Sequence, residues 1–369
     1  MDNKSINIVC YYASEYAGNF IPSILHLSES IKSKKRIIFT FPKEAENRYW
    51  IKHIREKGYD VFFISNFSNK HVFKKELREI NKDNNVNIVY THFVSGLKAK
   101  TVYPFSHKIK LVIHVHSDFT GSGSHSFKRK LLRFVEFNLI RRDAKYIFVF
   151  KYLCPKVNKR FFDVNNALCV DRIVDKALDI KDFKVQNNIS DNDTTFLIFG
   201  WSPFIKGVDI AVKAFLDLPA ELKNKAKLII VHGRNDGYER CINFLKTKLQ
   251  SDEFLNEKSI VFVKPLEDVF SLYSMTDVFV SASRSEGFSY SVIEALYFGN
   301  QCLVSDIKGT IWSKDYDNVS VFHSENSDEL SKLMAECLSE KKKKILNTKI
   351  IDDFSIEEWS KKIGQILFE

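Results

Sequence analysis

Long apolar runs and paired cysteines are both missing from this sequence. No stretch of its 369 residues approaches the roughly 18 to 20 uninterrupted apolar residues of a membrane-spanning helix, so any membrane contact should be peripheral. The 6 cysteines are scattered without a CxxC pair or a metal-ligand spacing, which is typical of reduced core thiols in a cytosolic protein. The N-terminus also lacks the basic-then-apolar order of a signal peptide. We therefore expect a cytoplasmic protein.

Repeats at solenoid periods are absent as well, and the length exceeds that of one ordinary hydrophobic core. The composition, 44% hydrophobic and 28% charged, is that of a soluble globular protein. A formal net charge of +10 favours anionic partners such as nucleotides, nucleic acid or an acidic lipid surface. Nucleic acid is the poorest of these explanations, because no recognition fold or stacking platform accompanies the charge.

Short apolar runs alternate with helix-like segments along the chain, and this pattern predicts parallel sheets built from strand–helix–strand units. In the first half we expect strands at Ile6–Tyr12, Arg36–Phe41, Asp60–Ile64, Val86–Thr91, Lys110–His116 and Lys145–Phe150. In the second half we expect them at Thr195–Gly200, Lys227–His232, Ile260–Val263, Asp277–Ser281 and Gln301–Ser305. Each half can form its own doubly wound sheet, and the polar stretch 179–193 has the composition of a linker between them.

Two glutamates follow the expected strand Asp277–Ser281. The segment that contains Glu286 and Glu294 is typical of a strand end, a glycine-bearing turn and a helix start, which would gather both carboxylates and several backbone N–H groups. Carboxylates accept from sugar hydroxyls, whereas a diphosphate binds amide donors at the positive end of a helix. The element therefore predicts a sugar-nucleotide site. Ser291 and Glu294 also fit a capping box, which would make Glu294 a helix start, with Gly299 as the helix stop.

A second candidate element joins an expected strand to an expected helix, Val208–Phe215. The strand ends at Gly200, a turn follows, and Lys206-Gly207 precedes the helix. A lysine delivered to a strand–helix loop commonly neutralises phosphate. The pair is a weak signal by itself, and it gains weight from the glutamate element in the same half.

Together the two elements resemble the retaining family 4 glycosyltransferases, which have the two-domain GT-B fold. The residues that carry the resemblance are Gly200, Lys206-Gly207, Glu286-Gly287-Phe288, Glu294-Ala295, Gly299, Asn165-Asn166-Ala167 with Asp171, and Asp353-Phe354-Ser355 to Trp359. The resemblance implies an α/β protein with two doubly wound Rossmann-like domains facing a cleft. It implies an N-terminal acceptor-side domain at 1–170, a nucleotide-sugar donor domain at 171–350, and a C-terminal helix at 351–369 that crosses back to the first domain.

The resemblance also implies roles for these side chains. Glu286 would bind donor-sugar hydroxyls, Glu294 the ribose hydroxyls, and Lys206 the diphosphate. The residues expected to bind the donor are Gly18, Gly200, Lys206, Arg234, Glu286, Gly287, Phe288, Ser289, Tyr290, Ser291 and Glu294. Lys206 would also stabilise the charge of the leaving group, where electrostatic help lowers the barrier most.

Three positions depart from the family pattern. Trp201 stands where the family often has an arginine that binds the diphosphate, so Arg234 or Arg284 would have to substitute for it. Ser289 replaces the second glycine of the turn. In the first half, Gly18 is the single glycine of a loop that is glycine-rich in the family, and the loop also reads as an ordinary strand-to-helix turn.

Histidines gather near the end of the expected strand Lys110–His116. His114 and His116 should project from the same side, because residues two apart share one face of a strand. A histidine that ends such a strand resembles the family's active-site histidine, so we expect His116 to be catalytic together with Lys206 and Glu286. His92, at the end of the preceding strand, is a further candidate by position. The alternative is a histidine packed and hydrogen-bonded within the sheet.

A metal site is a rival interpretation, since His114-x-His116-x-Asp118 matches the start of the HxHxDH motif of metallo-β-lactamase-like hydrolases. Phe119 follows in place of the last histidine, and the two-sheet pattern does not suit that fold. We therefore expect no metal and no cofactor, with a nucleotide diphosphate sugar, a UDP-sugar by preference, as co-substrate. Lys206 and helix N-termini would offset the diphosphate charge.

The segment Lys128–Arg142 is basic and amphipathic, with Leu131, Phe134, Val135 and Leu139 at helical spacing. Such a face could lie on anionic lipid at the inner side of the membrane, which would suit a lipid-linked acceptor. The alternative is a core-packed helix with solvated basic residues. A second basic run, Lys341–Lys344, is expected to be a solvated helix end.

The function expected from this sequence is transfer of a hexose, with retention, from a nucleotide diphosphate sugar to a glycan or lipid-linked acceptor in cell-surface polysaccharide synthesis. Two alternatives remain open at this level. A nucleotide-sugar epimerase of the same fold would need no acceptor, and a non-catalytic GT-B partner would bind without turnover. Titration with nucleotide sugars, followed by incubation with and without acceptor, separates the three.

Overall fold

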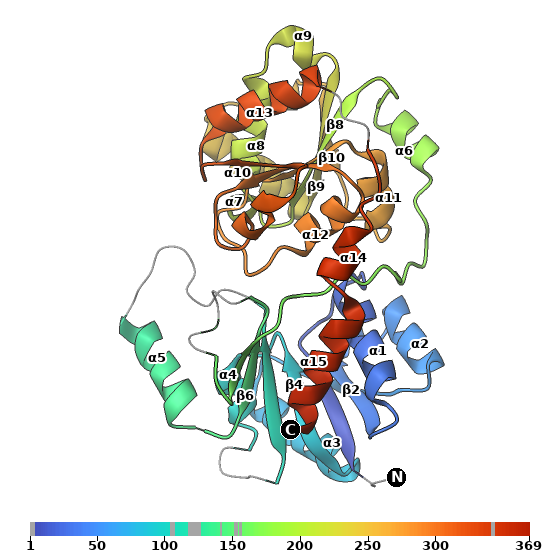
Figure 1. The fold of residues 1–369 in the computed structure, drawn as a ribbon, viewed down its shortest axis with the longest axis vertical. Helices are drawn as coiled ribbons and strands as arrows, with labels where there is room; N and C mark the ends of the chain where they lie inside the picture. The colour runs from blue at the N-terminus through green and yellow to red at the C-terminus, as the bar shows by residue number, and fades with distance from the viewer. Residues whose placement is uncertain are drawn as a thin grey trace. The chain divides into compact units, whose positions relative to one another are not determined.

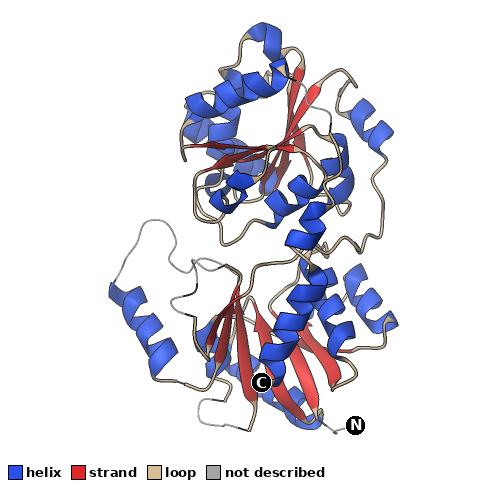
Figure 2. Cartoon of the chain, viewed as in Figure 1, coloured by secondary structure: helices blue, strands red, loops and turns tan. Residues whose placement is uncertain are grey.

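The computed structural model describes residues 4–103, 108–116, 127–140, 142–150, 154, 157–340 and 344–369 (Figure 1). The chain divides into two compact units: unit 1 comprises Met1–Asp175 and Phe354–Glu369, and unit 2 comprises Lys176–Asp353. The boundaries expected from the sequence, 170/171 and 350/351, lie within five residues of these divisions. Each unit has a parallel sheet with helices on both faces (Figure 2).

Unit 1 contains a seven-stranded sheet of order β3-β2-β1-β4-β5-β6-β7 in the described part of the chain. The strands are β1 Ser5–Cys10, β2 Arg36–Pro42, β3 Asp60–Ile64, β4 Val86–His92, β5 Lys110–Val115, β6 Lys145–Phe148 and β7 Phe161–Asp163. The helices are α1 Phe20–Ile31, α2 Tyr49–Glu56, α3 Lys70–Asp83, α4 Gly96–Lys100, α5 Phe127–Asn138 and α15 Ile356–Phe368, with a 3₁₀ turn at Lys43–Ala45. All six predicted strands are confirmed to within two residues at each end.

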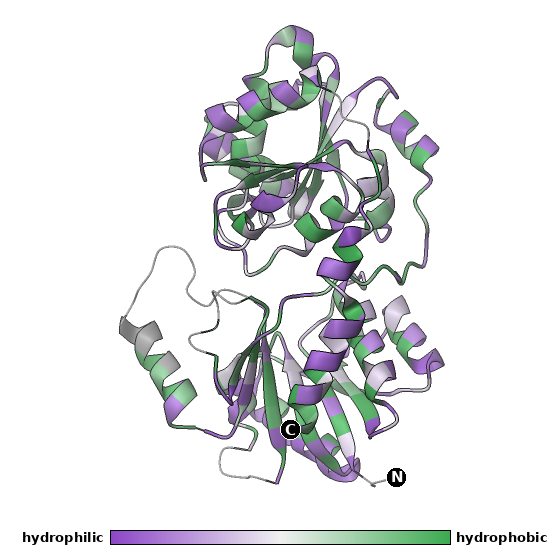
Figure 3. Ribbon diagram, viewed as in Figure 1, coloured by the Kyte–Doolittle hydropathy of each residue, from purple (hydrophilic) through white to green (hydrophobic). Residues whose placement is uncertain are grey.

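Alternating side chains of the strands in unit 1 form two hydrophobic cores, one on each face of the sheet. On β1, Ile6 and Ile8 face a core shared with α1, α2 and α15, whereas Val9 faces a core shared with α3. Helix α15 starts at the N-cap Ser355, whose hydroxyl accepts from the N–H of Glu358. The purple and green bands along α15 show its polar and apolar faces (Figure 3). This amphipathic pattern explains why the last helix packs on unit 1.

Unit 2 contains a six-stranded sheet of order β10-β9-β8-β11-β12-β13 in the described residues. The strands are β8 Thr194–Gly200, β9 Ala226–His232, β10 Ile260–Val263, β11 Val278–Ser281, β12 Gln301–Ser305 and β13 Val319–Phe322. The helices are α6 Ile180–Gln186, α7 Pro203–Lys206, α8 Val208–Leu216, α9 Ala220–Lys223, α10 Gly237–Leu249, α11 Val269–Met275, α12 Tyr290–Tyr297, α13 Ser327–Ser339 and α14 Lys349–Asp353, with 3₁₀ turns at Glu253–Leu255 and Ile311–Asp315. The five predicted strands are confirmed.

Two sequence predictions about unit 2 are wrong. The stretch 179–193, predicted as a linker, contains α6, because the Asp179 side chain caps the helix and Phe183 is buried. Lys344, predicted to be solvated, donates hydrogen bonds to the carbonyls of Ser274 (3.1 Å) and Thr276 (2.7 Å). These carbonyls lie at the C-terminal end of α11, where a positive charge interacts favourably with the helix dipole.

Both sheets reverse their strand order once, and this reversal determines where a ligand can bind. In unit 1 the order turns at the neighbours β1 and β4, and in unit 2 it turns at β8 and β11. The connections leave these two strands on opposite sides, and folds of this kind bind ligands beyond the carboxyl ends of such strands. The loops after β8 and β11 are therefore the first place to look for a site in unit 2. The same reasoning selects the ends of β1 and β4 in unit 1.

Candidate active site

Lys206 and Glu286 form an ion pair at the carboxyl ends of β8 and β11. Lys206 ends the short helix α7, and Glu286 lies in the loop between β11 and α12. Lys206 Nζ is 2.5 Å from Glu286 Oε1, and the two side chains are 10% and 14% exposed. The Ser283 hydroxyl donates to the same carboxylate oxygen at 2.9 Å. The sequence predicted both residues as site candidates, and the structure brings them together at the carboxyl ends of β8 and β11.

Three glycines let the loops around this pair come close. A Cβ on Gly207, where φ is +64°, would lie 1.9 Å from the carbonyl oxygen of Ala282 at the end of β11. A Cβ on Gly309 would lie 2.5 Å from both Cβ and the carbonyl oxygen of Glu286. On Gly200 it would lie 3.0 Å from a methyl carbon of Val208. The missing side chains therefore set the distance between the lysine loop and the glutamate loop.

Helix α12 starts directly after the glutamate turn, and its first residues correct one prediction. The N-cap is Ser289, whose side chain makes no capping hydrogen bond, so the capping box between Ser291 and Glu294 is not formed. The hydroxyls of Ser289 and Ser291 instead hydrogen-bond each other at 2.9 Å. Glu294 lies inside the helix and is buried, at 6% exposure. Gly299, with φ +71°, follows the last helical turn as predicted.

The turn before α12 is held in place by aromatic packing. The ring of Phe288 is buried and stacks on Trp312 with 4.8 Å between centroids. Gly287 and Tyr290, on either side of this part of the turn, are half-buried. Phe288 thus anchors the turn that carries Glu286, which is a positioning role.

Arg284 is not available as a replacement for the arginine missing at position 201. Its guanidinium makes a bidentate pair with Asp209 at 2.9 and 2.8 Å and donates to the carbonyl of Phe204 at 2.7 Å. The Asp209 carboxylate raises the pKa of Arg284. This pair ties the glutamate loop to α7 and α8. Asp209 escaped the sequence analysis, because an aspartate in the first turn of a helix is common and carries no specific signal.

Trp201 and Arg234 follow the ends of β8 and β9. The Trp201 side chain is 59% exposed, and the Lys206 ammonium lies 4.9 Å from its ring centroid. Arg234 is half-buried and follows Gly233, on which a Cβ would lie 3.2 Å from the Trp201 carbonyl oxygen. Both residues are thus at the same edge of the sheet as the lysine–glutamate pair. Trp201 contributes an aromatic surface where the family pattern has a charge.

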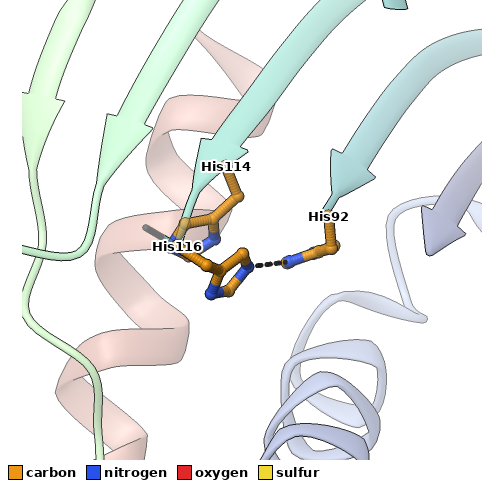
Figure 4. A group of neighbouring side chains, drawn as sticks. All are labelled: His92, His114 and His116. Atoms are coloured by element: carbon orange, nitrogen blue, oxygen red, sulfur yellow. Dashed lines mark hydrogen bonds between the residues drawn. The ribbon is translucent and has the colours of Figure 1, made fainter. Parts of the chain in front are cut away.

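The candidate histidines His92, His114 and His116 belong to unit 1, and so does Gly18. Gly18 is exposed, with φ +57°, in the loop between β1 and α1. His92 and His114 are register partners at the ends of β4 and β5, and His116 follows β5 on the same face (Figure 4). His92 Nδ1 and His116 Nε2 share a hydrogen bond of 2.9 Å, and His114 Nδ1 is 2.6 Å from the Tyr90 hydroxyl. Burial lowers the pKa of all three histidines.

Asp118 and Phe119, which follow this cluster in the sequence, lie outside the described residues. Among the described residues no helix is long and apolar enough to cross a membrane. Five of the six cysteines are buried, and Cys154 is half-buried.

Two doubly wound units with parallel sheets define a GT-B fold. Residues 179–352 match the profile of the family described as "Glycosyl transferases group 1". The protein is a glycosyltransferase, and its second unit is similar to that family.

Proteins of known function with similar sequences are bacterial. The chain is 24% identical over 341 residues to the N,N'-diacetylbacillosaminyl-diphospho-undecaprenol alpha-1,3-N-acetylgalactosaminyltransferase of Campylobacter jejuni, covering 85% of each chain. It is 25% identical over 243 residues to the N-acetyl-alpha-D-glucosaminyl L-malate synthase of Bacillus anthracis, covering 63% of this chain and 60% of the relative.

Solved structures with the same fold cover nearly the whole chain. A glycosyltransferase from Rickettsia africae ESF-5 has a TM-score of 0.74 at 17% identity, with coverage of 100% of this chain and 98% of the other. Anabaena HepE in complex with UDP and glucose has a TM-score of 0.77 at 14% identity, with coverage of 99% of each chain. At this identity the likeness shows the fold, and it confirms the predicted GT-B class.

Proposed function

We propose that the protein transfers a hexose from a UDP-sugar to a lipid-linked glycan acceptor, with retention, in the synthesis of a cell-surface polysaccharide. The observation that carries the donor assignment is the largely buried ion pair of Lys206 and Glu286 at the carboxyl ends of β8 and β11. A carboxylate beside an ammonium suits a ligand that has sugar hydroxyls at one end and a diphosphate at the other. The Campylobacter relative, whose name includes a diphospho-undecaprenol acceptor, supports the lipid-linked class.

Lys206 and Glu286 are placed to act on the two ends of the bond that breaks during transfer. When the bond between the anomeric carbon and the phosphate oxygen breaks, the electron pair stays with the diphosphate, and Lys206 stabilises the added negative charge. Glu286 accepts hydrogen bonds from sugar hydroxyls and fixes the sugar. The acceptor oxygen bonds to the anomeric carbon on the face that the phosphate leaves, and the hydroxyl proton passes to the phosphate oxygen. Because Glu286 already holds Lys206, the ammonium is in place before the donor arrives.

Two substitutions test the donor site. Lys206→Ala and Glu286→Gln should each reduce kcat/KM for transfer by about 100-fold or more, because each removes a group that acts on the transition state. Lys184→Ala is the matched control, since Lys184 and Asp191 form an exposed pair of 2.7 Å in the same unit. Calorimetric titration with UDP, GDP and ADP identifies the base, and NMR of the product identifies the anomer. Near-normal transfer by both site variants would reject the donor assignment, and an inverted product would reject retention.

We also propose that α5 rests on an anionic lipid surface. Leu131, Phe134 and Leu139 are 51%, 56% and 55% exposed, which opposes the alternative of a core-packed helix for these residues. The same segment of sequence carries Lys128, Arg129, Lys130, Arg133, Arg141 and Arg142. An exposed apolar face within a basic helix is the combination that binds anionic headgroups.

Vesicle sedimentation tests this surface. The protein should bind vesicles that contain phosphatidylglycerol and should bind pure phosphatidylcholine much less. Phe134→Ser should weaken binding, whereas Val185→Ser, at a residue 76% exposed in unit 2, should leave it unchanged. Equal sedimentation of the Phe134 variant and the parent protein would reject the lipid contact.

A further inference from the structure

The ring of Trp201 lies against the lysine of the candidate donor site. We propose that Trp201 is a positioning residue, whose indole holds the Lys206 ammonium through a cation–π contact and keeps it in place for the diphosphate of the donor. The proposal rests on the proposed donor site of unit 2. It goes beyond that site because it gives a role to the side chain that stands in the position of the family's arginine, for which the sequence predicted no function.

Local geometry brings the ring and the ammonium together. Trp201 directly follows β8, and Lys206 is the last residue of α7. The backbone N–H of Lys206 donates to the carbonyl of Ser202 at 2.9 Å and closes the turn between them. Lys206 Nζ then lies 4.9 Å from the centroid of the Trp201 ring, within the limit of about 6 Å for a cation–π contact. On the other side, Gly233 approaches the Trp201 carbonyl oxygen so closely that a Cβ would lie 3.2 Å from it.

Core packing does not account for this tryptophan. The Trp201 side chain is 59% exposed, and the buried core of unit 2, in the part of the chain that is described, is built from other residues. Lys206 is the more buried member of the contact, with a side chain that is 10% exposed. Removal of the indole should therefore leave the fold of unit 2 intact and change the surroundings of the lysine.

An aromatic ring holds an ammonium without cancelling its charge. An ammonium has three N–H donors, and in this site it meets Glu286 Oε1 at 2.5 Å and faces the indole as well. The carboxylate offsets the positive charge, and in the proposed donor complex it also accepts from sugar hydroxyls. The indole attracts the cation through its quadrupole and carries no net charge. The ring thus keeps Lys206 in place while its charge remains available to the diphosphate.

The expected benefit is that the lysine is ordered before the donor binds. A lysine side chain has many rotamers, and fixing it during binding reduces affinity, whereas fixing it during folding does not. Loss of this preorganisation corresponds to about a 3- to 10-fold loss of nucleotide affinity. The loss should be smaller than that caused by removing the ammonium itself, because Glu286 still holds Lys206.

Nucleotide titration of a double-mutant cycle tests the proposal. The parent protein is titrated calorimetrically with UDP, GDP and ADP, and the nucleotide that binds most tightly is used for the variants. Trp201→Leu should weaken its binding by about 3- to 10-fold. Trp201→Phe keeps an aromatic face and should recover most of this loss. In a Lys206→Met background, Trp201→Leu should have no further effect, because the ring acts through the ammonium.

Phe204→Leu is the matched control. Phe204 is a second exposed aromatic residue of this segment, at 49%, and its ring lies 4.5 Å from the Arg284 guanidinium. Its truncation should leave nucleotide affinity unchanged, and an equal loss in Phe204→Leu and Trp201→Leu would overturn the proposal as a general effect on α7. Circular dichroism establishes that the variants are folded.

The remaining outcomes separate the positioning role from the donor site. Parent-like binding by Trp201→Leu, with weak binding by Lys206→Met, would overturn the positioning role and retain the donor site. An equal loss from Trp201→Leu with and without Lys206 would show that the indole contacts the nucleotide directly, and it would also overturn the role. Normal binding by Lys206→Met, or binding of none of the three nucleotides by the parent protein, would reject the donor site and the positioning role together.

Discussion

Replacement of Gly207 by alanine should damage both the stability of unit 2 and its affinity for the donor. The new Cβ would lie 1.9 Å from the Ala282 carbonyl oxygen, where ordinary contacts begin at 3.4 Å, so the two loops would have to separate by about 1.5 Å. The left-handed backbone, φ +64°, costs alanine about 1 to 2 kcal/mol, and forced overlap in a packed region costs about 1 to 3 kcal/mol more. We expect a total loss of about 2 to 5 kcal/mol.

Gly58→Ala is the matched control for the cost of placing alanine in a left-handed backbone conformation. Gly58 has φ +84°, and a Cβ there meets nothing within 4 Å, so the variant carries the conformational cost without the overlap. It should lose about 1 to 2 kcal/mol. Because the two units need not unfold together, amide hydrogen exchange is the suitable assay, read at α8 for Gly207 and at β3 for Gly58.

The same shift should weaken donor binding. Separating the loops moves Lys206 away from Glu286, so the two side chains can no longer both reach the donor. Loss of one charge-assisted contact with the donor is worth about 1.5 to 3 kcal/mol, or about a 10- to 100-fold change in affinity. Calorimetry with the nucleotide sugar measures this change, and Gly58→Ala should leave the affinity unaltered. Equal destabilisation by the two variants, or normal donor affinity in Gly207→Ala, would refute the argument that close approach of these loops builds the site.

Two further predictions concern buried charges in unit 2. Arg284→Met leaves the Asp209 carboxylate buried without its partner and should cost about 3 to 5 kcal/mol in the free energy of unfolding, whereas the double variant with Asp209→Leu should recover most of the loss. A small loss in the single variant, measured by hydrogen exchange at α8, would contradict this assignment. Burial lowers the pKa of Lys344 to about 8, below its value in an unfolded chain, so the unfolded state binds more protons between pH 8 and about 10.5 and stability should rise across that range. The full shift corresponds to at most about 3 kcal/mol, and partial solvent exposure reduces it to about 1 to 2 kcal/mol. Urea denaturation across this pH range should show it as the difference in the free energy of unfolding between the parent protein and Lys344→Met. A difference that falls with pH would be inconsistent with this sign.

The sequence predicted strands well where apolar runs were long enough to be recognised. It missed β7, Phe161–Asp163, and β13, Val319–Phe322, because these short strands carry half-exposed residues and lie at sheet edges. It mistook α6 for a linker, since the helix has a largely polar surface and depends on the cap by Asp179 and on the buried ring of Phe183. Local composition cannot show that one buried ring is sufficient to fix a segment on its unit.

Part of the candidate site followed from the sequence in the same way. Lys206 and Glu286 each occupy a loop after a strand, and parallel sheets gather such loops at one edge. The pairing of Arg284 with Asp209 did not follow, because it depends on which loop of unit 2 folds over which helix. The capping box of Ser291 and Glu294 was wrong because the helix starts at Tyr290, and helix starts are set by tertiary packing as much as by local pattern.

The sequence by itself determined the two-unit α/β organisation, the eleven principal strands and the loops that carry the lysine and the glutamate, because these depend on periodicity and on residues close together in the chain. The tertiary structure decided which distant side chains meet. Register between β4 and β5 places His92 beside His114, and the bare Cα of Gly207 lets one loop rest on another. Such contacts depend on the register of strands and the packing of loops, and neither is encoded in a local pattern of residues.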